Sequence, residues 1–115
     1  MTVTILHNPA CSKSRATLAL IREAGIEPQI VRYLETPPDR ARLTALLAAM
    51  GLAPRALLRK GETAYKALGL ADPALSDAQL IEAMLSEPRL IERPIVETPK
   101  GVRLCRPPER VQEIL

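Results

Sequence analysis

Residues 3–34 of the 115-residue chain have the sequence VTILHNPACSKSRATLALIREAGIEPQIVRYL, in which a strand, a helix and a second strand are expected in turn. Val3–His7 is a short apolar-rich run suited to a buried strand. Ala16–Ala24 carries apolar residues at helical spacing until Gly25 ends the helix. Pro28–Leu34 is rich in β-branched and aromatic residues and predicts a second strand. Strand, helix and strand with short joins predict a right-handed crossover between two parallel strands.

The middle of the chain, residues 39–86, shows helical patterns alone. Asp39 is placed to cap a helix that ends before Gly51. Ser76 and Gln79 form a capping-box pattern at the start of another helix. Shorter helical pieces are expected at Ala56–Arg59 and at Thr63–Leu68. We therefore expect only helices in this segment.

The β character returns after Pro88. Ile95–Thr98 and Val102–Cys105 flank the turn PKG and predict a hairpin, and a last helix with the sequence ERVQEIL begins at Pro107 or Pro108. The order βαβ, helices, ββα predicts an α/β fold: a thioredoxin-like core with a mixed sheet and an inserted helical segment. We expect a single domain over residues 1–115. Its core is formed by residues 1–36 and 88–115, and the helical insertion covers residues 37–87.

Composition limits the classes of protein that the chain can represent. It is 47% hydrophobic but contains no Phe and no Trp, so its core must be aliphatic. Two cysteines do not form a disulfide framework, which favours reduced thiols and a cytoplasmic location. No apolar run approaches the roughly 18 residues of a membrane span, and the first residues do not resemble a secretion signal. A net charge of +3 and a pI near 9.2 favour anionic partners.

Cys11 is the position at which the sequence predicts chemistry. A preceding strand and a helix that starts near Ser12 place its sulfur at a helix N-terminus, where unpaired N–H groups and the helix dipole stabilise a thiolate. Lys13 and Arg15 add positive charge, and a protonated His7 would add more. The features that lower the pKa of a thiol also bind an oxyanion. A nucleophile and its anionic substrate can thus share one set of donors.

Other roles for Cys11 fit the sequence less well. A free cysteine is often simply a buried small hydrophobe. One histidine and two cysteines fall short of a closed metal site, so no metal is expected. A Cys-x-x-Cys dithiol fails at Ser14, and the C-x5-R loop of tyrosine phosphatases fails at Thr17. Cys105 is expected to be a structural thiol on a strand. A single-thiol nucleophile remains.

The chain resembles the glutaredoxin-coupled arsenate reductase (ArsC) family, within the ArsC/Spx thioredoxin-like superfamily. The resemblance lies in segments that follow the family's order: HNPACSKSR, YLETPP, RALLRK, ERPIVETPKGVRLCRP and PPERVQEIL. The first segment alone is typical of the whole superfamily, which includes the Spx regulators. The set RALLRK, RPIV and RLCRP indicates the reductases. The matches run from about residue 3 to residue 115.

The resemblance implies roles for individual residues. Cys11 matches the catalytic cysteine, which attacks arsenate and displaces water. His7 matches a residue that helps to keep this thiol ionised, and Ser14 matches one that donates a hydrogen bond near the sulfur. The three arginines that bind the oxyanion in the family are matched by Arg59, Arg93 and Arg106. Guanidinium groups suit this task because they give permanently charged, forked donors to tetrahedral oxygens. The resemblance also implies a cis peptide bond before Pro94.

The implied activity is the reduction of arsenate to arsenite, a reaction of arsenic detoxification. In the family mechanism glutathione attacks the Cys–S–As(V) adduct, arsenic becomes trivalent, and glutaredoxin restores the thiol. The expected partners are therefore arsenate, glutathione as co-substrate, and glutaredoxin. No tightly bound cofactor, nucleic acid or membrane is implied.

Alternative interpretations stay open on the sequence alone. One is an Spx-like, thiol-responsive regulator that binds RNA polymerase, although Ser14 stands where a Cys-x-x-Cys switch needs its second cysteine. Another is an ArsC-like oxidoreductase with an unassigned substrate. Some residues also have ordinary structural explanations: Arg59 would complement the C-terminal end of a helix, and His7 would be a surface histidine at a strand end.

Overall fold

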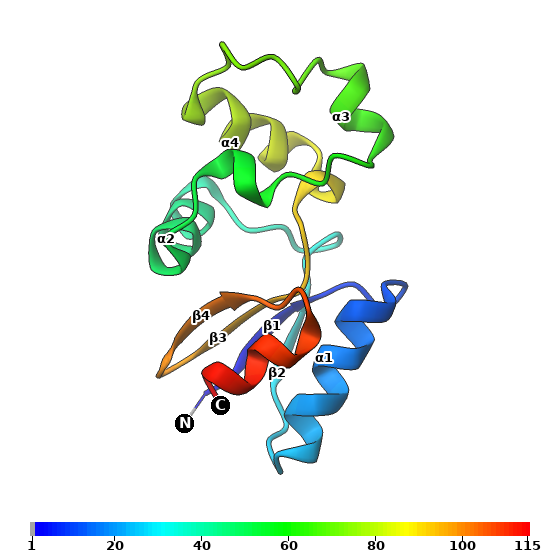
Figure 1. Cartoon of the computed structure of the whole chain (residues 1–115), viewed down its shortest axis with the longest axis vertical. Coiled ribbons are helices and arrows are strands. Elements are labelled where there is room, and N and C mark those ends of the chain that lie inside the picture. Colours follow the sequence, from blue (N-terminus) through cyan, green and yellow to red (C-terminus); the bar gives the residue numbers. More distant parts are fainter. Residues whose placement is uncertain (1) are drawn as a thin grey trace. The chain divides into compact units, whose positions relative to one another are not determined.

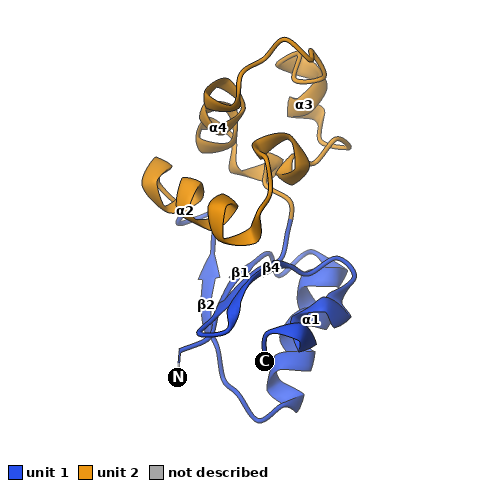
Figure 2. Cartoon of the chain, turned by 60° about the vertical axis from the view of Figure 1, so that its left-hand side comes forward, with its two compact units in different colours: residues 1–36, 93–115 blue, residues 37–92 orange. Residues whose placement is uncertain are grey.

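The computed structural model describes residues 2–115 and divides the chain into two compact units, which Figure 2 colours separately. The first unit contains the chain up to Thr36 and again from Arg93 to Leu115. The second unit is Pro37–Glu92. The first unit is therefore discontinuous in sequence, and the second is inserted into it.

The first unit is a mixed four-stranded sheet covered by helices (Figure 1). Its elements are β1 (Thr4–His7), α1 (Ser12–Glu23), β2 (Gln29–Arg32), β3 (Ile95–Thr98), β4 (Gly101–Leu104) and the 3₁₀ helix η3 (Pro108–Glu113). The strand order is β2-β1-β3-β4, with β1 parallel to β2 and antiparallel to β3. The α1 and η3 helices pack against each other on one face of the sheet. The predicted α/β fold with a mixed sheet is confirmed.

An aliphatic core holds the first unit together. Its members come from the sheet, α1 and the C-terminal segment: Val3, Ile5, Leu18, Ile21, Val96, Cys105, Val111 and Ile114. Complete burial of a Val, Leu or Ile side chain stabilises a fold by about 1.5–3 kcal/mol relative to exposure. Side chains of this kind therefore supply the core of a chain that has no Phe and no Trp.

The α1 helix begins and ends where local sequence signals place its termini. Cys11 is the N-cap residue, with an extended backbone. The helix ends at Glu23, and Gly25 follows the C-cap residue with a φ of 80°, a conformation that glycine adopts easily. The N–H of Gly25 donates to the carbonyl of Arg22 (3.0 Å), and that of Ile26 donates to the carbonyl of Ile21 (3.3 Å). These two bonds form a Schellman motif, which satisfies carbonyls that the helix leaves open.

The second unit consists of short helices. They are α2 (Arg40–Met50), the 3₁₀ helix η1 (Pro54–Leu57), α3 (Thr63–Ala67), α4 (Asp77–Ser86) and the 3₁₀ helix η2 (Pro88–Leu90). Asp39 caps α2 by accepting from the N–H of Arg42 (2.8 Å), and Gly51 ends this helix in the left-handed conformation. Ser76 and Gln79 form the capping box of α4. These cap predictions are confirmed.

The segment around Arg59 differs from its prediction. The helical turn is η1, which starts at Pro54 and stops before Leu58 instead of running to Arg59. Leu58 is extended and forms an isolated β-bridge with Ile91. The prediction of helices alone between residues 39 and 86 is therefore wrong at this point. Pairing with a distant, buried segment outweighs the helical tendency of the local sequence.

The C-terminal part of the chain follows the predicted hairpin and last helix. The β3 and β4 strands pair in antiparallel fashion, and η3 starts at Pro108. The peptide bond before Pro94 is cis, as expected, and so is the bond before Pro107, which was not predicted. Within residues 2–115, no helix is both long and apolar enough to span a bilayer.

Candidate active site

The predicted catalytic residues of the first unit meet at one edge of its sheet. His7 is the last residue of β1, and a short loop leads from it to Cys11 at the start of α1. Leu6 pairs with Ile95, and Ile95 pairs with Leu104. Arg93 lies just before β3, and Arg106 lies just after β4. When these registers are continued past the strand ends, both arginines lie at the same edge of the sheet as His7 and Cys11.

The loop before Cys11 is fixed by Asn8. The carbonyl of Asn8 accepts from the Cys11 N–H (3.0 Å), and its side-chain oxygen accepts from the Ala10 N–H (3.0 Å). The Asn8 N–H donates to the Ser14 hydroxyl (3.1 Å). Three hydrogen bonds from one buried residue thus hold the turn that presents the sulfur. Asn8 was not among the predicted site residues, and its only local signal is the tendency of asparagine to bond backbone groups two residues on.

The Cys11 thiol is half-buried, and its pKa is lowered from the ordinary value. Burial acts against ionisation, but it is outweighed by the backbone N–H of Ser14, by a hydrogen bond and the positive charge from Arg93, and by the backbone N–H of Lys13. The sulfur makes no capping hydrogen bond of ordinary geometry, so these N–H groups stabilise it mainly as electrostatic donors. A helix N-terminus with an adjacent guanidinium is the type of environment that makes a cysteine nucleophilic.

His7 is buried, with 5% of its surface exposed, and is not a surface histidine. Its Nδ1 shares a hydrogen bond of 2.6 Å with the Ser14 hydroxyl. Burial lowers its pKa, and the charges of Arg32, Arg22 and Arg15 lower it further. A protonated His7 would add positive charge to the site, but its lowered pKa opposes protonation at neutral pH. Desolvation and three neighbouring cations keep the imidazole neutral.

Ser14 contacts the site in two ways. Its backbone N–H stabilises the Cys11 thiolate, whereas its fully buried hydroxyl bonds to His7 and to the N–H of Asn8. The hydroxyl therefore organises the loop beneath the sulfur. His7 and Ser14 act together as a buried polar pair that supports this loop.

Arg93 and Arg106 lie beside each other in the first unit. The charge of Arg93 and a side-chain hydrogen bond from its guanidinium help to lower the pKa of the Cys11 thiol, and Arg106 Nη1 donates to the Arg93 carbonyl (3.1 Å). The Nε of Arg93 is buried and has no hydrogen-bond partner among the described residues. The structure thus brings Cys11, Arg93 and Arg106 together. A donor set of this kind suits an oxyanion next to the sulfur.

Arg59 belongs to the second unit. Its Nη1 lies 2.9 Å from Glu92 Oε1, and its Nε lies 4.0 Å from Glu62 Oε2. The side chain is 25% exposed. It is therefore held by carboxylates of its own unit, and its part in substrate binding stays a prediction.

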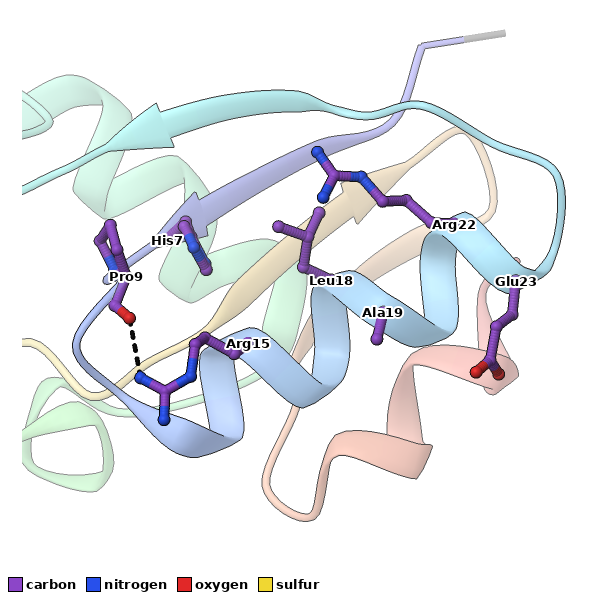
Figure 3. A pocket seen from close by; sticks show the side chains of 7 residues that line it. All are labelled: His7, Pro9, Arg15, Leu18, Ala19, Arg22 and Glu23. Carbon is purple, nitrogen blue, oxygen red and sulfur yellow. Dashed lines mark hydrogen bonds between the residues drawn. The ribbon is translucent and has the colours of Figure 1, made fainter.

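An open groove runs along α1 (Figure 3) and has a volume of about 640 Å³. It is lined by His7, Pro9, Arg15, Leu18, Ala19, Arg22 and Glu23. Arg15 is tied to the loop by a hydrogen bond from its Nη1 to the Pro9 carbonyl (2.8 Å). Cys11 is not part of the lining, so the groove is a feature separate from the thiol. Among residues 2–115, no three His, Cys, Asp or Glu side chains are grouped so that they could hold a metal ion.

Comparisons with known proteins agree with this architecture. The family model described as "ArsC family" matches residues 6–114. The chain is 58% identical over 113 residues to an arsenate reductase of Escherichia coli (strain K12), covering 98% of this chain and 80% of the relative. It is 53% identical over 114 residues to the uncharacterized protein YfgD of the same strain, covering 98% and 96% of the two chains.

A solved structure gives the same result for the fold. The structure of an arsenate reductase from Vibrio cholerae superposes with a TM-score of 0.96 and 52% sequence identity, covering 100% of this chain and 98% of that one. This chain is therefore similar to that arsenate reductase in both sequence and fold over nearly its whole length. The chain belongs to the ArsC family.

Proposed function

We propose that this protein reduces arsenate to arsenite, with glutathione and a glutaredoxin as external reductants. The observation that carries the proposal is a thiol of lowered pKa, at a helix N-terminus, hydrogen-bonded to the guanidinium of Arg93. The relatives in E. coli and V. cholerae named above are arsenate reductases. The chemistry of the site and the activity of these relatives therefore support the same reaction.

In the first step, the Cys11 thiolate attacks the arsenic of arsenate. A sulfur–arsenic bond forms, one arsenic–oxygen bond breaks, and the displaced oxygen leaves as water after protonation. Arsenic stays pentavalent. The guanidinium groups of Arg93 and Arg106 bind the remaining oxygens and stabilise the negative charge in the transition state. We propose the same role for Arg59, whose charge is permanent.

In the second step, the thiol of glutathione attacks the sulfur of Cys11. The electron pair of the sulfur–arsenic bond passes to arsenic, which becomes trivalent and leaves as arsenite. Cys11 and glutathione are left joined as a mixed disulfide. The thiolate of glutaredoxin then attacks the glutathione sulfur, takes over glutathione as its own mixed disulfide and releases the Cys11 thiol.

The cysteines of the chain support an external reductant. Ser14 occupies the position at which a Cys-x-x-Cys motif has its second thiol. Cys105 is fully buried in the core, and burial raises its pKa to about 12. A thiol with this pKa is almost entirely protonated at neutral pH and is a poor resolving nucleophile. Each turnover therefore depends on thiols supplied by other molecules.

A coupled assay tests the proposed function. Purified protein is mixed with arsenate, glutathione, glutaredoxin, glutathione reductase and NADPH, and NADPH oxidation is followed. We expect arsenate-dependent oxidation with the wild type and with Cys105→Ser, and none above background with Cys11→Ser. A wild-type rate equal to that of Cys11→Ser would refute the proposal.

A further inference from the structure

Tyr33 is a buried residue that the proposed mechanism leaves without a role. It follows β2 directly, and its side chain is completely buried, although Gln29, Ile30 and Arg32 of that strand are exposed. The phenol therefore leaves an exposed edge strand and enters the protein interior. A buried tyrosine normally gives its hydroxyl a polar partner.

Strand register places Tyr33 in a row with the site residues. His7 pairs with Arg32 in the parallel β1–β2 ladder, so the next position places Tyr33 beside Asn8. The registers described above place Arg93 on the other side of Asn8. Neighbouring strands lie about 4.8 Å apart, so the Tyr33 and Arg93 backbones are separated by about 10 Å. The side chains of tyrosine and arginine are together long enough to span this distance.

Arg93 has two partners for its guanidinium, and Tyr33 is one of them. Burial lowers the pKa of Arg93, but it is outweighed by the charge that Tyr33 carries when ionised, by a hydrogen bond and the charge from Cys11, and by a hydrogen bond to Tyr33, which raise it. The group is therefore held from two directions, by the phenol and by the sulfur.

The chemistry of the partner matters for the charge of Arg93. A carboxylate partner, such as the Glu92 that holds Arg59, neutralises much of a guanidinium's field. A phenol is uncharged at neutral pH and accepts the hydrogen bond without neutralising the cation. Arg93 thus keeps its charge for the thiolate and for an oxyanion.

We infer that Tyr33 is a positioning residue that holds the Arg93 guanidinium against the Cys11 sulfur. Its effect on arsenate turnover rests on the proposed function, but its effect on the thiol does not. The thiol is surrounded by Arg93, by the backbone N–H groups of Ser14 and Lys13, and by the helix N-terminus. Only the first of these groups depends on Tyr33.

The test is the Tyr33→Phe variant, which removes one oxygen and keeps the ring. The rate of Cys11 alkylation by iodoacetamide is measured against pH to obtain the thiol pKa. A shift of about half to one pH unit toward higher pH is expected, so alkylation near neutral pH slows by about 3- to 10-fold. The control is Tyr65→Phe in α3, which alters a tyrosine of the second unit and should leave the profile unchanged.

A second pair of variants separates positioning from general damage. If Tyr33 acts through Arg93, then Tyr33→Phe has no further effect on the thiol pKa in an Arg93→Ala background. An additional shift in that background, or a Tyr33→Phe profile identical to the wild type, would overturn the inference. Failure of the proposed function would give a different result: the thiol pKa would still shift in Tyr33→Phe, but neither the wild type nor this variant would reduce arsenate. If Tyr33 positions Arg93 and the protein reduces arsenate, kcat/KM for arsenate falls about 10-fold or more in Tyr33→Phe.

Discussion

At the scale of single residues, the two cysteines show how position decides reactivity. Cys11 lies at the start of α1 with donors around its sulfur, and its pKa is lowered. Cys105 lies in the core, and its pKa is raised to about 12. Burial raises the pKa of the fully buried Cys105, whereas Cys11 is only half-buried and the helix N-terminus and Arg93 outweigh its burial. A reactive and an inert thiol therefore coexist in one unit.

Removal of the Ser14 hydroxyl is expected to destabilise the protein. Ser14→Ala leaves the Nδ1 of His7 and the N–H of Asn8 buried without this partner, which costs about 1–3 kcal/mol of unfolding free energy. Chemical denaturation of the two proteins measures the difference. The matched control is Ser12→Ala, an exposed serine of the same helix, for which little change is expected. Equal losses in the two variants would contradict the proposed support of the loop.

The single histidine is expected to make stability depend on pH. The pKa of His7 is lowered from about 6.5 in the folded protein, so below this pH the unfolded chain binds a proton that the folded protein does not. Unfolding free energy therefore decreases as pH falls through this window, and the loss stops once the folded-state pKa is passed. Denaturation curves of the wild type and His7→Gln between about pH 5 and 7 test this assignment. Identical pH dependence in both proteins would argue against it.

Residue roles differ in how far the sequence predicts them. The placement of Cys11 at a helix N-terminus is local information, because a strand, a short loop and a helix follow one another. The neutral state of His7 depends on its burial and on the charges of Arg32 and Arg22, and both arise only in the folded protein. Tyr33 was missed for the same reason, since its partner Arg93 is distant in sequence.

At the scale of elements, local sequence signals predict the ends of helices correctly wherever a capping residue marks the boundary. Asp39, Gly51 and Ser76 lie at the helix ends that the sequence indicates. The prediction failed around Leu58, where the Arg59 N–H donates to Leu90 and a bridge to Ile91 forms. That pairing joins segments that are far apart in the chain. Helical periodicity carries no information about such a partner.

The capping box of α4 gives an element-scale prediction. The Ser76 hydroxyl accepts from the Gln79 N–H (3.2 Å), and the Gln79 side chain accepts from the Ser76 N–H (2.8 Å). We expect Ser76→Ala to lower the unfolding free energy by about 1 kcal/mol. Thermal or urea denaturation measures this loss. Ser86→Ala, at the other end of α4, is the control and should change stability less, so the reverse ranking would contradict the capping role.

At the scale of the whole molecule, the predicted anion-binding arginines are divided between the two units. Arg93 and Arg106 belong to the first unit, and Arg59 belongs to the second. The expected core began at residue 88, whereas the first unit resumes at Arg93 because η2 packs with α3 and α4. The sequence order βαβ, helices, ββα predicts an insertion. The order of elements in the sequence does not show that η2 packs with α3 and α4 and therefore belongs to the second unit.

The division between units gives a prediction for Arg59. Arg59→Ala is expected to lower kcat/KM for arsenate by about 10- to 100-fold, the effect of losing one charged hydrogen bond. The iodoacetamide profile of Cys11 should stay as in the wild type, because the groups that lower its pKa belong to the first unit. The coupled assay and the alkylation profile measure the two effects. Full activity in Arg59→Ala would show that the arginine serves its ion pair with Glu92 alone.

The discontinuity of the first unit has a consequence for synthesis on the ribosome. The β1 and β2 strands and Cys11 are made first, but β3, which pairs with β1, and Arg93 follow only after the whole inserted segment. The hydrogen bonds within the helices of that segment are local, so these helices can form while translation continues. Until Arg93 has emerged and β3 has paired with β1, the nascent chain lacks the guanidinium that lowers the pKa of its thiol. Full activation of the nucleophile is therefore coupled to completion of the sheet, and the unfinished polypeptide is less exposed to premature oxidation or alkylation.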